Sequence, residues 1–123
     1  MLALVVDDSR AMRSILTRIM TGLGFDVAQA GDGAEALSVI EAGATPDVVL
    51  VDWNMPVMDG LAFVKAVRAR EDLRSVSLMM VTTESEHAQI VRALAAGAHE
   101  YVIKPFTVEV IGEKLALLGL VAA

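Results

Sequence analysis

Short aliphatic runs alternate with amphipathic stretches along the chain, and this alternation restricts the fold more than any other feature of the sequence. The runs lie at Leu2–Val6, Phe25–Gln29, Val48–Val51, Ser77–Val81 and Tyr101–Ile103. After each run, apolar residues recur at steps of three and four, which is typical of one face of a helix. Strands that alternate with helices indicate a parallel sheet covered by helices on both faces.

Polar residues mark the beginnings of several of these helices. Ser9 or Asp8 can cap the first helix, and Thr107 can cap the last one. Asp59, which precedes Gly60, indicates a helix cap and a turn rather than a metal ligand.

The composition limits the class of protein. With 123 residues, of which 55% are hydrophobic, the chain suits one well-filled core, so we expect a single domain over residues 1–123 and no effector domain. No uncharged stretch reaches the roughly 18 residues of a spanning helix. The net charge of −6 argues against a nucleic-acid surface. There is no cysteine to form a disulfide or a thiolate metal site. We therefore expect a cytoplasmic domain that does not bind membranes or nucleic acid.

Chemically active side chains follow the predicted strands. They are Asp7, Asp8, Asp52, Thr82, Thr83 and Lys104. In an open α/β sheet, ligands bind outside the carboxyl ends of the strands, so we expect these side chains to lie close together. Clustered carboxylates repel one another unless a cation lies between them. Because all the candidate ligands are oxygens, the cation that they favour is Mg²⁺.

A carboxylate beside a metal, a lysine and a hydroxyl is suited to phosphoryl transfer. Asp52 stands alone at the end of the central strand and is the better candidate for the nucleophile. Asp7 and Asp8 are the candidate metal-binding pair. The metal and Lys104 would neutralise charge on the phosphoryl oxygens.

Four segments, VVDDS, DVVLVDWNMPVMDG, MMVTTE and YVIKPF, resemble the receiver domains of two-component response regulators. The resemblance covers essentially the whole chain and is closest to the single-domain chemotaxis regulators of the CheY type. It implies a flavodoxin-like (βα)5 three-layer sandwich, with a five-stranded parallel sheet in the order 2-1-3-4-5.

The same resemblance assigns roles to individual residues. Asp52 would be the phosphoacceptor. Asp7, Asp8 and Asp52, together with the backbone carbonyl of Asn54, would bind Mg²⁺. Lys104 would pair with the phosphoryl group.

It also assigns a switch. Thr82 would bond to the phosphoryl group, and Tyr101 would turn inward when Thr82 moves. The Lys104–Pro105 peptide would be cis. Thr83 departs from the small residue that is common in the family at this position, and we expect it to alter the phosphate lifetime or partner access.

The resemblance further implies partners. A histidine kinase of the CheA type would supply the phosphoryl group, and the chain would catalyse only its own phosphorylation and dephosphorylation. The output would be binding to another protein, which in chemotaxis would be the flagellar motor switch. The binding surface would be formed by the fourth helix, the fifth strand and the fifth helix, around Glu86, His87, Tyr101 and Lys114. We expect a monomer.

Other readings remain open. Within the same family, a phosphate sink or a phosphorelay shuttle would carry the same residues. A Mg²⁺-dependent phosphatase of the haloacid-dehalogenase type would need an acid two residues after the nucleophile, where this chain has Asn54. An FMN-binding flavodoxin would need a glycine- and hydroxyl-rich loop in place of the acidic segment VVDDSR.

Overall fold

The computed structural model describes residues 1–83 and 87–122, without the side chain of His87. Five parallel strands form one sheet in the order β2-β1-β3-β4-β5. They are β1 (Leu2–Val6), β2 (Asp26–Ala30), β3 (Val48–Asp52), β4 (Ser77–Thr83) and β5 (Glu100–Lys104). The predicted sheet and its strand order are confirmed.

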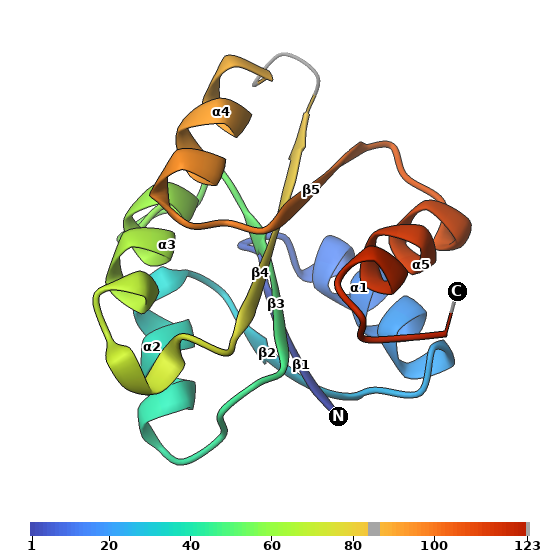
Figure 1. Cartoon of the computed structure of the whole chain (residues 1–123), viewed down its shortest axis with the longest axis horizontal. Coiled ribbons are helices and arrows are strands. Elements are labelled where there is room, and N and C mark those ends of the chain that lie inside the picture. The colour runs from blue at the N-terminus through green and yellow to red at the C-terminus, as the bar shows by residue number, and fades with distance from the viewer. Residues whose placement is uncertain (84–86, 123) are drawn as a thin grey trace.

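Helices cover both faces of this sheet. They are α1 (Arg10–Gly22), α2 (Gly33–Glu41), α3 (Gly60–Arg68), α4 (His87–Ala96) and α5 (Val108–Leu117), with a short 3₁₀ turn, η1, at Glu71–Leu73. Helices α1 and α5 lie on one face, and α2, α3 and α4 lie on the other (Figure 1). None of the helices in the described part of the chain is both long and apolar enough to cross a bilayer.

The buried side chains form two clusters because successive residues of a strand point to opposite faces of the sheet. On β1, for example, Val5 packs with α1 and α5, whereas Leu4 packs with the helices of the other face. The strands β1, β3 and β4 are almost entirely buried, which is why their sequences are continuously aliphatic. This buried sheet holds the carboxyl ends of the central strands in fixed positions.

The observed boundaries refine the predicted ones. Strand β2 begins at Asp26 rather than at Phe25, which is buried but lies outside the strand. Ser9, not Asp8, caps α1 by accepting a hydrogen bond from the Met12 amide. Asp59 caps α3 in the same way, as predicted. The 3₁₀ turn η1 was not predicted.

Arg68, at the end of α3, joins its helix to two other segments of the chain. Its guanidinium donates hydrogen bonds to backbone carbonyl oxygens before β4 and between α4 and β5. The acceptors belong to Leu73, Arg74, Val76 and Gly97. His99 Nδ1 lies 3.2 Å from Arg68 Nη2 and accepts a hydrogen bond from the Leu78 amide. Burial and the nearby Arg68 charge lower the pKa of His99. These contacts give His99 a structural role.

Candidate functional site

The alternation of side chains along the strands brings three charged groups to the same face of the sheet. Asp7, Asp52 and Lys104 each lie two residues beyond a buried side chain that packs against α1 and α5. Those side chains are Val5, Leu50 and Val102. Because residues two apart on a strand point the same way, the three charged groups continue this face past the end of the core.

Lys104 lies between the two buried carboxylates. Its Nζ atom is 3.3 Å from Asp52 Oδ1 and 3.7 Å from Asp7 Oδ2. Asp8 is exposed and completes the group, in which one carboxylate oxygen from each of Asp7, Asp8 and Asp52 lies within 4.8 Å of the others. We call these three aspartates and Lys104 the acidic rim. The three aspartates and Lys104 thus lie close together at this edge of the sheet, whereas Thr82, which was predicted to lie with them, belongs to the other face.

Asp7 shows that the rim suits a further cation. Its Oδ1 atom accepts a hydrogen bond of 2.8 Å from the Ser9 amide. Its Oδ2 atom is buried and has no hydrogen-bond partner, since Lys104 is too distant for one. A buried acceptor without a partner is costly. An all-oxygen group with such an unsatisfied atom fits a hard divalent cation.

The acidic rim also alters how its members titrate. Burial raises the pKa of Asp52 to about 6, and the neighbouring Asp7 charge adds to this rise, while Lys104 opposes it. Burial likewise raises the pKa of Asp7, against the opposing effects of the Ser9 amide and Lys104. One lysine therefore compensates for only part of the negative charge.

The loop after β3 is folded tightly against the phosphoacceptor candidate. The Gly60 amide donates a hydrogen bond of 3.0 Å to the Trp53 carbonyl. A Cβ atom at Gly60 would lie only 2.5 Å from the Asp52 carbonyl oxygen, so this position requires glycine. Asn54 is exposed in this loop, two residues after Asp52, and Val57 is exposed with a positive φ of 68°.

The predicted switch residues lie on the opposite face of the sheet from Asp52. Thr82 is buried, and Tyr101 is half-buried against the cluster packed by α2, α3 and α4. Tyr101 is paired in register with Met80, and Thr82 is two residues beyond Met80, so both side chains belong to this face. The Lys104–Pro105 peptide is cis, as the resemblance implied.

Lys114 of α5 joins Tyr101 on the predicted output face. Its Nζ atom lies 4.7 Å from the centroid of the Tyr101 ring and 3.0 Å from Glu100 Oε1. The other two residues predicted for this face, Glu86 and the side chain of His87, lie outside the described residues.

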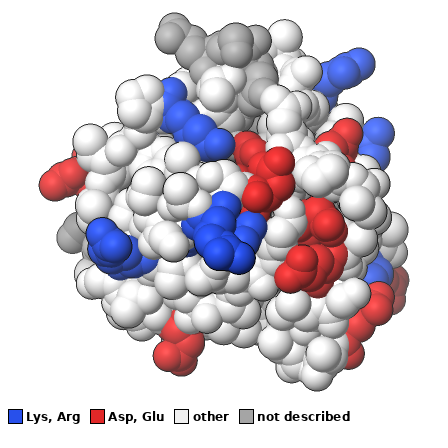
Figure 2. All heavy atoms as spheres, turned by 180° about the vertical axis from the view of Figure 1, so that it is seen from behind, with Lys and Arg blue, Asp and Glu red and all other residues white. Residues whose placement is uncertain are grey.

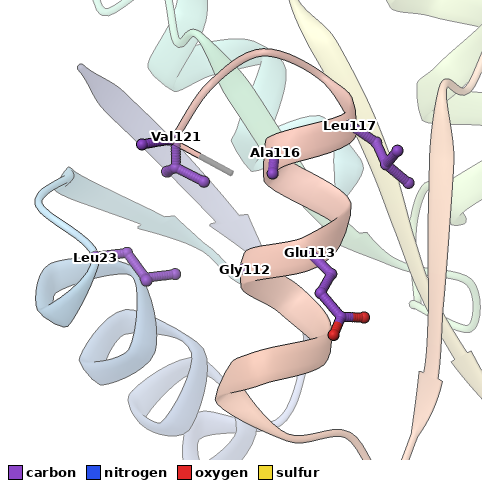
Figure 3. A pocket seen from close by; sticks show the side chains of 7 residues that line it. Leu23, Gly112, Glu113, Ala116, Leu117 and Val121 are labelled. Carbon is purple, nitrogen blue, oxygen red and sulfur yellow. The ribbon is translucent and has the colours of Figure 1, made fainter.

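The acidic rim is distinct from the apolar hollow on the α1–α5 side of the molecule. This hollow of about 550 Å³ lies between the end of α1, the small residues Gly112 and Ala116 of α5, and the C-terminal segment (Figure 3). Its only ionisable lining residue is Glu113. The hollow therefore offers volume without the groups needed for chemistry.

The distribution of surface charge is mixed. On the face shown in Figure 2, Asp and Glu side chains lie beside Lys and Arg side chains over the middle of the molecule. The described part of this face lacks the continuous basic patch that nucleic-acid binding requires.

The geometry agrees with comparisons to known proteins. The family model for the response regulator receiver domain matches residues 3–116. The chain belongs to this family. The receiver is 44% identical over 116 residues to chemotaxis protein CheY1 of Helicobacter pylori (strain J99), with 94% of each chain covered. It is 45% identical over 113 residues to a CheY homologue of Campylobacter jejuni (strain 81-176), covering 91% of this chain and 87% of that relative.

Solved structures support the same conclusion. The chemotaxis response regulator CheY4 of Vibrio cholerae superposes with a TM-score of 0.87 at 36% identity, covering 95% of this receiver and 97% of that chain. The resemblance and the flavodoxin-like fold predicted from the sequence are thus confirmed, and the chain is a receiver domain of the CheY-like kind.

Proposed function

We propose that this receiver is a phosphorylation-controlled switch in which Asp52 accepts the phosphoryl group. The observation that carries the proposal is the position of Asp52, whose carboxylate is buried beside the Lys104 ammonium and two further carboxylates at the end of the central strand. The pKa of about 6 leaves Asp52 ionised at neutral pH, as a nucleophile must be.

In the proposed reaction, a carboxylate oxygen of Asp52 forms a bond to phosphorus while the bond between phosphorus and the donor breaks. Lys104 holds a positive charge next to the attacking carboxylate and would pair with the incoming phosphoryl oxygens. Asp7, Asp8, Asp52 and the backbone carbonyl of Asn54 would hold Mg²⁺. When bound, the metal supplies charge neutralisation for the phosphoryl group.

The switch would pass from one face of the sheet to the other through β4. The phosphoryl group would draw Thr82 towards Asp52, since Val81, which immediately precedes Thr82, pairs in register with Asp52. Movement of Thr82 would leave room for Tyr101, which shares its face of the sheet. The new charge would thereby bias an equilibrium between two arrangements. Thr83, beside Lys104 in register, would affect access to the phosphoryl group.

We propose that the output of this single domain is binding to another protein in the cytoplasm, and not turnover of a separate substrate. The surface formed by α4, β5 and α5, which includes Tyr101 and Lys114, would carry that binding. The names of the relatives favour chemotaxis. In that case a histidine kinase would be the phosphodonor and the flagellar motor switch would be the target. A phosphate sink or shuttle is the alternative within the same family.

Intact mass after incubation with a small acyl phosphate tests the chemistry. With Mg²⁺ we expect a single phosphoryl adduct, and without Mg²⁺, or in Asp52→Asn, we expect none. An adduct that survives the substitution would refute the role of Asp52.

Affinity capture with the beryllofluoride-activated receiver tests the output. Recovery of a motor-switch component by the activated form, and not by the untreated form, would support motor control. Recovery of a histidine phosphotransfer protein or a kinase alone would favour the shuttle or sink instead.

A further inference from the structure

A groove of about 420 Å³ lies between α3 and α4, away from both the acidic rim and the apolar hollow. Its lining consists of Leu61, Lys65, Arg92, Ala95 and Ala96. Leu61 and Ala96 are half-buried and pack against the core, so they form an apolar floor. The two cationic side chains come from different helices, Lys65 from α3 and Arg92 from α4.

The electrostatic character of this groove differs from that of the whole protein. The chain has a net charge of −6, yet neither α3 nor α4 contains Asp or Glu. Lys65 and Arg92 are exposed, and neither side chain forms an ion pair with any described residue. Two positive charges that have no ion-pair partner among residues 1–83 and 88–122 thus flank an apolar floor.

The groove is also separate from the proposed output face. Ile90 and Ala93 of α4 are buried, which fixes the side of the helix that faces the core. At 100° per residue, the exposed Val91 and Leu94 fall on one flank of α4, and Arg92 falls on the other flank. The α3 side of α4 is therefore available to a partner independently of Tyr101.

We propose that this groove docks an acidic amphipathic helix of a partner protein. An apolar stripe on that helix would cover Leu61 and Ala95, and carboxylates on either side of the stripe would pair with Lys65 and Arg92. The groove lining has no aromatic, amide or hydroxyl side chain to recognise a nucleobase, so the charge pattern favours a peptide over a nucleotide. The inference does not depend on phosphorylation of Asp52.

Fluorescence anisotropy with a designed peptide tests this proposal on the full chain. The probe is a labelled helical peptide with a Leu–Ala stripe flanked by Glu, and its counterpart carries Lys in place of Glu. We expect the receiver to bind the Glu peptide at least about tenfold more tightly than the Lys peptide, with an affinity that falls as salt screens the charges. Equal binding of the two peptides, or no binding of the Glu peptide, would overturn the proposal.

Matched variants locate the binding. The double variant Lys65→Glu/Arg92→Glu should lose about tenfold or more in affinity for the Glu peptide. The control Arg10→Glu/Arg18→Glu changes the net charge equally, at exposed positions on α1, and should lose less than about threefold. Equal losses in both variants would mean nonspecific attraction and would refute the groove.

A third variant, Ala95→Glu, retains both cations and places a carboxylate in the groove. It should also weaken binding of the Glu peptide, while its circular dichroism spectrum matches that of the wild type. Backbone amide shifts on titration should be confined to α3 and α4, and shifts centred on Val91, Leu94 and Tyr101 would instead assign the peptide to the output face.

Discussion

Three charged side chains determine how the acidic rim behaves at the scale of single residues. Asp7 and Asp52 are buried, and Lys104 is the cation that faces both of them. The pKa of each of the two aspartates is raised, which shows that the lysine does not fully offset burial and mutual repulsion. Electrostatic strain at the rim should therefore be measurable in the metal-free protein.

Asp52→Asn should stabilise the metal-free receiver at neutral pH. The folded-state pKa of Asp52, about 6, lies above its ordinary value of 3.8, so the folded state binds more protons than the unfolded state between these values. The free energy of unfolding of the wild type should fall as the pH rises from 4 to 6, by at most about 3 kcal/mol from this group. Urea unfolding in EDTA at pH 4.5 and 7.5 measures the free energies of unfolding of the wild type and of Asp52→Asn, and the advantage of the variant should be larger at pH 7.5.

Lys104→Met should destabilise the metal-free receiver because it removes the positive charge between Asp7 and Asp52. Methionine retains most of the aliphatic stem, so the change tests the charge alone. We expect a loss of about 2 kcal/mol at pH 7.5, less than for a fully buried pair because Lys104 is partly exposed. Lys114→Met is the control, since it removes a lysine of similar exposure that faces a single, less buried carboxylate, Glu100, and it should cost less. Equal unfolding midpoints for the two variants would argue against a strained rim.

At the scale of elements, periodicity predicted most of the strands and helices. Strand β3 was predicted within one residue because its run of buried aliphatic side chains is continuous. The predicted bounds of the edge strand β2 were wrong by one residue. Only one of its five residues is buried, so its pattern is weak, and the buried Phe25 was predicted to be its first residue. The turn η1 is short and has no periodicity from which to predict it.

The role of Arg68 could not be predicted, because its acceptors are backbone carbonyls of irregular segments whose positions no sequence periodicity indicates. Arg68→Met should lower the free energy of unfolding by about 2 to 4 kcal/mol, since several carbonyls in the turns around β4 would lose their donor. Arg74→Met removes only an exposed ion pair with Glu71 and should cost less than about 0.5 kcal/mol. Chemical denaturation measures the free energy of unfolding of both variants. A similarly small decrease in Arg68→Met and Arg74→Met would contradict the bridging role of Arg68.

At the scale of the whole molecule, the parallel sheet gathers residues that are as far apart in the sequence as Asp7 and Lys104. Their convergence could be predicted because Asp7 follows β1 and Lys104 ends β5, and the carboxyl ends of parallel strands lie at one edge of the sheet. The groove between α3 and α4 could not be predicted from the sequence, because it depends on how the two helices pack side by side on the sheet. Sequence patterns thus predicted the positions of the charged side chains at the sheet edge better than they predicted the grooves between helices.

Mg²⁺ should raise the melting temperature of the whole domain, since a ligand that binds only the folded state stabilises it. Asp8→Ala should raise the melting temperature in EDTA, by removing one of the repelling charges, and should abolish the response to Mg²⁺. Asp8 is exposed, so its removal leaves the core intact. Differential scanning fluorimetry provides the measurement, and the fluorescence of the buried Trp53 next to Asp52 should report the same binding. A melting temperature independent of Mg²⁺ would contradict a metal site formed by Asp7 and Asp8.

The central claim is that the acidic rim directs a phosphoryl group to one carboxylate. Borohydride reduces an acyl phosphate to an alcohol, which converts a phosphorylated aspartate into homoserine and releases phosphate. We would treat the receiver with a small acyl phosphate and Mg²⁺, reduce it, and locate the homoserine by tandem mass spectrometry. We expect homoserine at position 52 only, and only when Mg²⁺ is present. Homoserine at position 7 or 8, or at position 52 to the same extent in EDTA, would refute the role of Asp52 as the Mg²⁺-dependent phosphoacceptor.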